Sequence, residues 1–297
     1  MSKQQIKRLI ADRAREDGLT ETGIEGVQLF RSTEPIPCAP TVYAPCVVAI
    51  VSGSKEVVSD GRRHVYGNER YLCCPMTMPL KAGTPAASPE NPLYGVLISL
   101  DRRVMTGLTM EMQSTGRWPP GTMEEPGTHG ICLARWDDAF ADALLRVLNL
   151  GSSQSDTAIL GEGRLREVLY AVLNGDAGAS AKQAFGAGNA VARSIAYMSS
   201  HLGEAITIDD LSKLAGMSRA AFHRKFKTAT AMAPMQFVKA MRLNEAAMQI
   251  AAGGTVGEAA RNAGYASPSQ FSREFRNMYG QSPRQWGKTR PALAGVS

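Results

Sequence analysis

The chain has 297 residues, a length typical of two domains, and its apolar fraction of 44% is enough for each to bury a core. It carries a net charge of +6, and no apolar run approaches the roughly 18 residues of a membrane-spanning helix. The basic N-terminus lacks the apolar run of a signal peptide, so we expect a cytoplasmic protein.

The first half begins with a short amphipathic helix over residues 3–14 and then changes to a β pattern. Short β runs alternate with Gly- and Pro-containing turns at 27–31, 46–51, 56–59, 62–66, 70–74, 76–81 and 93–100. Asp60-Gly61 between two of them predicts a hairpin. Many short strands at close spacing are typical of a small barrel or sandwich.

Two helical segments follow the strands, at 136–150 and 156–173, and a Gly-, Ala- and Ser-rich linker is expected over 174–188. Both helices carry apolar stripes, which include Leu144 and Leu148 in the first and Leu165, Leu169 and Val172 in the second. Such stripes serve either as core within one subunit or as a dimer interface, and the pattern leaves both open.

Near the C-terminus the chain repeats itself. The segment from Ser218 to Lys227 recurs from Ser267 to Arg276, with Ser, Phe, Arg, Phe and a final cation at the same offsets. Each copy follows a short apolar helix pattern and a Gly-containing turn, at Gly216 and Gly264. The pattern predicts two tandem helix-turn-helix motifs, and this motif binds DNA in a sequence-specific manner.

Capping residues mark the same boundaries in both copies. Thr207 with Asp210, and Thr255 with Glu258, place a hydroxyl N-cap and an acid three residues later at the start of each first helix. Ser218 and Ser267 begin the second helices.

In each second helix two Phe residues at i and i+4 share a face that we expect to be buried. The opposite face carries Arg219, Ala220, His223, Arg224 and Lys227 in the first copy, and Ser269, Gln270, Arg273 and Arg276 in the second. Arg pairs with guanine and Gln with adenine in the major groove, so these are the candidate DNA-binding residues. A merely solvated helix face is the alternative, which two faces in register disfavour.

A long helix is predicted over residues 234–250, between the repeats. Its length of roughly 26 Å could hold two reading heads about one turn of DNA, roughly 34 Å, apart. Residues 189–297 carry 14 Lys and Arg against 6 Asp and Glu, a net of +8, so the +6 of the whole chain leaves −2 for residues 1–188. The basic third is therefore the part that suits a polyanion.

Residues 189 to 286 resemble the DNA-binding domain of the AraC/XylS family of bacterial transcription regulators. The resemblance is carried by Gly216-Met217-Ser218, Phe222, Arg224, Phe226-Lys227, Pro234, Arg242-Leu243, Ala263-Gly264-Tyr265, Phe271-Ser272-Arg273, Phe275-Arg276 and Ser282-Pro283. It implies base contacts from Ala220, His223 and Arg224 and from Ser269, Gln270 and Arg273. Ala220 is too short for a polar base contact and is limited to packing on a thymine methyl.

Residues 1–188 resemble the cupin-like effector domain of one subgroup of that family, through Cys46-Val47-Val48, Gly53, Tyr71-Leu72, Pro79, Ser88-Pro89-Glu90 and Leu100-Asp101. The resemblance implies a barrel that binds a small-molecule effector and helices that pair two subunits into a homodimer. Candidate effector-binding residues on the strands are Val48, Ile50, Tyr71 and Cys73, with the inward parity left open.

Neither a metal nor another cofactor is expected. Only His64 and His129 are available in the first half, without a His-x-His pair. Five cysteines lie there too, Cys38, Cys46, Cys73, Cys74 and Cys132, without a C-x-x-C spacing. Cys73 and Cys74 are adjacent on a predicted strand and should point to opposite faces. They serve either as small core residues or as a sensor of electrophiles or oxidants.

The sequence therefore predicts an N-terminal cupin-like β-barrel with a helical dimerisation segment (1–188) and a C-terminal all-α tandem helix-turn-helix domain (189–297). The predicted function is sequence-specific transcription regulation, with promoter DNA, a small-molecule effector and RNA polymerase as partners, and activation favoured on the resemblance alone. An enzyme with a DNA-binding appendage is disfavoured because no catalytic constellation is found. An architectural DNA-binding protein is disfavoured because the two reading helices are polar and not identical.

Overall fold

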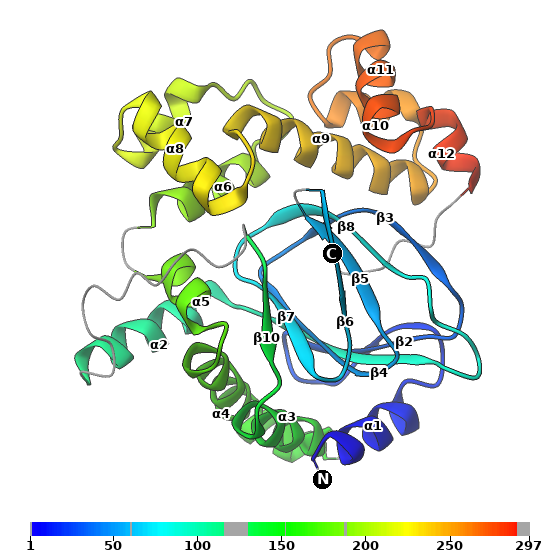
Figure 1. The fold of residues 1–297 in the computed structure, drawn as a ribbon, viewed down its shortest axis with the longest axis vertical. Coiled ribbons are helices and arrows are strands. Elements are labelled where there is room, and N and C mark those ends of the chain that lie inside the picture. The colour runs from blue at the N-terminus through cyan, green and yellow to red at the C-terminus, as the bar shows by residue number, and fades with distance from the viewer. Residues whose placement is uncertain (1, 60, 116–129, 152, 187–188, 290–297) are drawn as a thin grey trace.

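The computed structural model describes residues 2–59, 61–115, 130–151, 153–186 and 189–289. A β domain of two antiparallel sheets lies at the centre, with helices beneath it and an all-helical C-terminal part above it (Figure 1). The larger sheet has the order β1-β2-β9-β4-β7-β10 and the smaller one β3-β8-β5-β6. In the described residues the sheets form an open pair, so the expected barrel is not closed by a continuous ladder.

Most predicted strands are present within a residue or two of their expected bounds. The larger sheet contains β1 (Gly18–Glu21), β2 (Val27–Ser32), β9 (Leu93–Ser99), β4 (Cys46–Ser52), β7 (Arg70–Cys74) and β10 (Cys132–Arg135). The smaller contains β3 (Ile36–Tyr43), β8 (Met78–Thr84), β5 (Lys55–Ser59) and β6 (Arg62–Tyr66). β5 and β6 pair antiparallel on either side of Gly61, which has a φ of +70°, so the predicted hairpin is confirmed.

Three strands were not predicted, and each has a physical reason. β3 contains Pro37 and Pro40, which cannot donate to a ladder, and it is accordingly an edge strand. β1 and β10 are four residues long and lack an alternating apolar pattern.

Helices cover the larger sheet on its outer face. They are α1 (Ser2–Arg13), α3 (Asp138–Leu150) and α4 (Gln154–Asn174), close to the predicted segments. α2 (Arg102–Ser114) was not predicted; Asp101 caps it by accepting from the amides of Arg103 and Val104. The predicted linker is wrong over α5 (Gly178–Phe185), because Ala181, Ala184 and Phe185 bury an apolar face there.

The C-terminal part consists of α6 (Ala190–Ser200), α7 (Ile208–Ala215), α8 (Arg219–Thr230), α9 (Pro234–Ala251), α10 (Val256–Asn262), α11 (Pro268–Tyr279) and α12 (Pro283–Thr289). Asn189, at the predicted domain boundary, is the N-cap of α6. α9 runs across the top of the β domain with one helix-turn-helix at each end (Figure 1). Within the described ranges no helix is long and apolar enough to cross a membrane.

Candidate nucleic-acid interface and effector core

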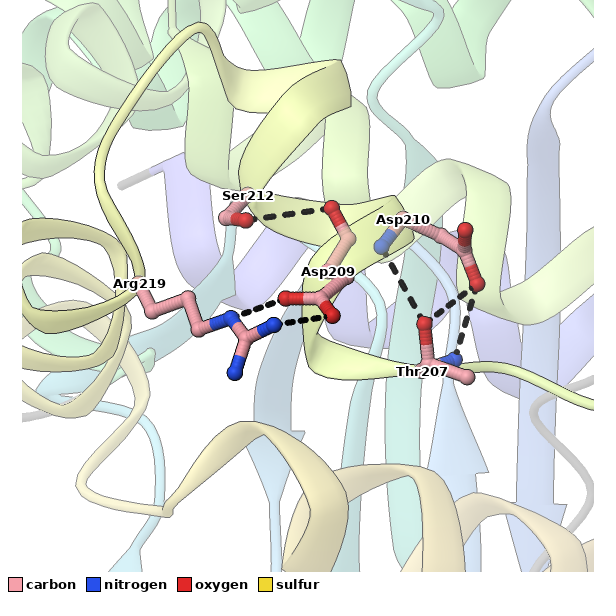
Figure 2. A network of polar contacts seen from close by, with 5 residues as sticks. All are labelled: Thr207, Asp209, Asp210, Ser212 and Arg219. Carbon is pink, nitrogen blue, oxygen red and sulfur yellow. Dashed lines mark hydrogen bonds and ion pairs between the residues drawn. The ribbon is translucent and has the colours of Figure 1, made fainter.

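The first helix-turn-helix is built by local capping. Thr207 and Asp210 form a capping box at the start of α7, with the Thr207 hydroxyl 2.6 Å from the Asp210 carboxylate (Figure 2). Gly216 then ends the helix with a φ of +64°, in the left-handed region that glycine tolerates. Ser218 caps α8 by accepting from the amide of Ala221. All these boundaries confirm the sequence prediction.

Arg219 contributes to this motif in a way that the sequence did not reveal. Its guanidinium forms a two-point ion pair with Asp209 on α7, as Figure 2 shows. The side chain therefore ties the first residue of the reading helix to the preceding helix. Pro268 occupies the matching place in the second repeat and can make no such pair.

α8 divides into a buried and an exposed face as predicted. Phe222 and Phe226 are fully buried, and Phe226 packs edge-on against Phe237 of α9 with ring centroids 5.3 Å apart. The opposite face is exposed along the helix and carries Arg219, Ala220, His223, Arg224 and Lys227. Within the described residues, the side chain of Arg224 has no hydrogen bond or ion pair, so its guanidinium is available to a ligand.

α11 repeats this division. Phe271 and Phe275 are fully buried, while Ser269, Gln270, Arg273 and Arg276 are exposed. The Gln270 amide donates to Glu274 of the same helix at 3.3 Å, and Tyr265 donates to that carboxylate at 2.9 Å. The side chain of Arg273, like that of Arg224, makes neither a hydrogen bond nor an ion pair with the described part of the chain.

α9 holds the two motifs together through packing on both sides. Its Arg242 donates to the carbonyl of Leu202, at 2.8 Å, on the side of the first motif. Trp286 of α12 donates to the Ala247 carbonyl, at 3.0 Å, on the side of the second. The helix has 18 residues and therefore a length of roughly 27 Å.

The same helix also contacts the β domain. Asn244 is fully buried, and its side-chain amide donates to the carbonyl of Thr41 on β3 at 3.2 Å. Its carbonyl oxygen accepts from the Tyr279 hydroxyl of α11 at 2.8 Å. One side chain thus joins an edge strand of the β domain, the connecting helix and the second reading helix. A polar Asn within the apolar stripe of α9 was the only sequence signal for it.

The candidate effector residues do not share one face of the larger sheet. Register pairs place Val47 opposite Cys73, and Val48 opposite Leu72. Because alternate residues point to opposite faces, Val48 and Ile50 lie on one side, and Tyr71 and Cys73 on the other. Tyr71 stacks on Phe140 of α3 at 4.3 Å, so that second side is the one covered by helices. The four residues therefore cannot line a single site.

Four of the five cysteines lie in two cross-strand pairs. Cys46 lies opposite Cys74 on one face of the larger sheet, and Cys73 lies opposite Cys132 on the other, which confirms the predicted divergence of Cys73 and Cys74. Burial raises the pKa of all four thiols above the usual value. An activated thiolate needs the opposite shift, so the structure favours the core interpretation.

His129 lies outside the described residues, and His64 is on β6. Among the residues that the structure describes, no three His, Cys, Asp or Glu side chains gather into a possible metal site.

A groove of about 440 Å³ lies between α2 and α4, away from the interior of the β domain. Leu108, Met112 and Tyr170 form its apolar wall, and an ion pair between Arg166 and Glu111 crosses it. This groove was not predicted from the sequence, because α2 itself was not predicted.

Comparisons with known proteins agree with the predicted assignment of both halves of the chain. A family model described as the AraC-type transcriptional regulator N-terminus matches residues 23–180, and a helix-turn-helix domain model matches residues 211–289. The probable transcriptional regulator LumQ of Photobacterium leiognathi is 33% identical over 91 residues, which are 30% of this chain and 37% of LumQ. The match thus spans about a third of that relative.

The crystal structure of ToxT from Vibrio cholerae O395 is similar in fold, with a TM-score of 0.53 at 11% identity over 90% of this chain and 98% of ToxT. A structure of V. cholerae ToxT with a bound unsaturated fatty acid has a TM-score of 0.52 at 12% identity, over 91% and 96% of the two chains. The N-terminal model covers more than half of the sequence. The protein therefore belongs to the AraC-type transcriptional regulators.

Proposed function

We propose that the C-terminal part binds promoter DNA by placing α8 and α11 in successive major grooves on one side of the duplex. The observation that carries the proposal is the exposed cationic face that each of these helices presents from matching positions at the two ends of α9. The local net charge of +8 supports it, because phosphate neutralisation dominates DNA affinity.

Within this proposal the nine exposed residues have different roles. The side chains of Arg224 and Arg273 have no partner among the described residues and occupy equivalent positions. They are therefore the principal base readers, with His223, Ser269 and Gln270 beside them. Ala220 packs on a thymine methyl. Lys227 and Arg276, near the helix ends, contact phosphates. Arg219 positions α8 through Asp209 and contributes charge more than base recognition.

Binding of the full-length chain to a promoter fragment and to a random duplex, each over a range of salt concentrations, tests the proposal. We expect a specificity ratio of at least about 10³ and a steep salt dependence. Equal affinity for both duplexes would instead indicate an architectural DNA-binding protein. Failure to bind either duplex would refute the assignment of α8 and α11 as reading helices.

We further propose that residues 1–188 bind a small-molecule effector and that the bound state alters the DNA-binding part. The domain carries a net charge of −2 and so has no electrostatic reason to contact DNA. ToxT, which is similar in fold, has been solved with an unsaturated fatty acid. The contact of α9 with β3 through Asn244 supplies a noncovalent route between the domains, beside the chain connection through α5 and α6.

In this proposal two copies associate through α4 and activate transcription by contacting RNA polymerase. The support for association is an exposed apolar surface at the start of α4, where Ile159 is 78% and Leu160 44% exposed. Membership of the family supports the contact with polymerase and the activation.

A further inference from the structure

An ammonium group is buried between the two sheets of the β domain, and no anionic group among the described residues pairs with it. Lys55 is 3% exposed on β5, and its Nζ lies 5.3 Å from the ring of Phe30 on β2, in the other sheet. The side chain therefore crosses the interior from one sheet toward the other. A Cβ at Gly95, the register partner of Phe30, would collide with that ring, so glycine there makes the arrangement possible.

The charged groups around Lys55 do not neutralise it. Glu56, the next residue, points to the other face of β5 and is paired with Arg63. The nearby thiol of Cys46 has its pKa raised to about 12 by burial, so it is uncharged at neutral pH. Within the described residues no carboxylate reaches the ammonium. Burying a charge without such a partner is costly unless a ligand supplies one.

Unpaired hydroxyl groups lie on the same face of the smaller sheet. Tyr66 is the register partner of Lys55, so its side chain lies on the same face of the sheet. Gly83 is the partner of Glu56, and the next residue, Thr84, therefore also lies on the face of Lys55. Tyr43 on β3 shares it too, since its partner Met78 is an even number of residues from Thr84. The three hydroxyl groups are buried and have no hydrogen-bond partner in the described structure. Leaving buried donors unpaired is unfavourable, so a ligand that accepts hydrogen bonds from these three hydroxyl groups would stabilise the site.

We propose that Lys55, Tyr66, Tyr43 and Thr84 form a buried subsite that receives the carboxylate of a small effector with an apolar body. The inference rests on the proposed effector role of residues 1–188. One ammonium balances the single charge of a carboxylate, and the hydroxyl groups donate to its oxygens. A phosphate dianion would bring a second charge that no described group in the interior balances.

The face of the larger sheet that opposes Lys55 would surround the apolar part of the effector. Ile50 and Phe30 both pair with Gly95, and Val48 and Cys46 continue the same face of β4. This face is apolar apart from the thiol and opposes Lys55. Met78, beside Tyr43, is an unbranched side chain that can change rotamer to admit a ligand.

Calorimetric titration of the full-length chain at pH 7 tests the subsite with acetate, hexanoate and benzoate, each compared with its alcohol, ethanol, 1-hexanol or benzyl alcohol. At least one acid should bind at least about tenfold more tightly than its alcohol, because only the acid meets the ammonium. Lys55→Met should remove that preference. Lys81→Met, an exposed lysine on the neighbouring β8, should leave it unchanged.

Two results would overturn the inference: no acid binds better than its alcohol, or Lys55→Met retains the preference. Circular dichroism checks that the variant folds, and if it does not, Tyr66→Phe decides the matter through a smaller loss of acid affinity, about threefold to tenfold. Promoter specificity measured on the same preparation separates the two proposals. If specific DNA binding persists while the acids fail, only the subsite is wrong, and the converse result refutes the DNA-binding proposal alone.

Discussion

Arg224 and Arg273 stand at equivalent positions of two reading helices, exposed and without a partner in the described chain. Replacing either with Ala should weaken specific DNA binding by about 1–3 kcal/mol and relax base preference at one position of the site. Lys227→Ala is the matched control, since loss of a phosphate contact should weaken binding to all sequences about equally. Binding isotherms on promoter and random duplexes measure both effects. An unchanged specificity ratio in the Arg variants would show that these residues do not read bases.

Lys55 should make folding stability depend on pH in the alkaline range. Burial lowers the pKa of its ammonium from 10.5 to about 8, so between these values the unfolded chain binds a proton that the folded chain does not. The contribution of Lys55 to the free energy of unfolding should therefore rise with pH across this window, by an amount on the order of 3 kcal/mol.

Comparison with Lys55→Met isolates that contribution. The neighbouring groups Cys46 and Tyr66 have their pKa values raised by burial, so their contributions to stability fall with pH, and these contributions are common to the wild type and the variant. Denaturant unfolding should show that the free energy of unfolding of the wild type, relative to that of the variant, is higher at pH 10 than at pH 7.5. A difference that is the same at both pH values would mean that Lys55 keeps an ordinary pKa in the folded protein.

At the scale of elements, α4 has two ends with different surroundings. Its C-terminal half buries Val168, Leu169 and Val172, whereas its N-terminal half leaves Ile159 and Leu160 exposed. The predicted stripe residues Leu169 and Val172 are therefore core within one subunit, and Ile159 and Leu160 lie outside that stripe. Nothing lies within 4 Å of a Cβ built at Gly163, one turn after Ile159, so a second helix could approach closely there.

Ile159→Glu should consequently weaken self-association without unfolding the chain. The charge would be buried against the second copy, but it is solvated in the monomer. Light scattering coupled to size exclusion, over a range of protein concentrations, measures the effect. The exposed Glu162→Gln is the control. A wild type that stays monomeric, or a variant that associates equally well, would rule out this surface.

At the scale of the whole molecule, Asn244 is the point where the β domain, α9 and α11 meet. Asn244→Asp would place a carboxylate against the Thr41 carbonyl and repel it, while the acceptor for Tyr279 remains. We expect faster hydrogen exchange in β3 and a DNA affinity that no longer depends on the effector. Tyr279→Phe, which removes only the bond within the C-terminal part, should keep β3 protected. If both variants leave β3 unchanged, the contact does not couple the domains.

The sequence alone determined whatever depends on neighbours along the chain. The capping boxes at Thr207 and Thr255, the turn at Gly216 and the Phe pairs of α8 and α11 involve residues a few positions apart, so local chemistry was enough to locate both helix-turn-helix motifs. The hairpin at Gly61 and the divergence of Cys73 from Cys74 follow from strand geometry in the same way.

Only the tertiary structure decided what depends on residues distant in sequence. The contact of Asn244 with Thr41 crosses 203 positions, and the approach of Lys55 to Phe30 depends on how one sheet faces the other. Strand periodicity gave two possible parities for the effector residues, and the choice between them required knowing which face the helices cover. The ion pair of Arg219 with Asp209 likewise depends on the angle between two helices, which the turn sequence does not specify.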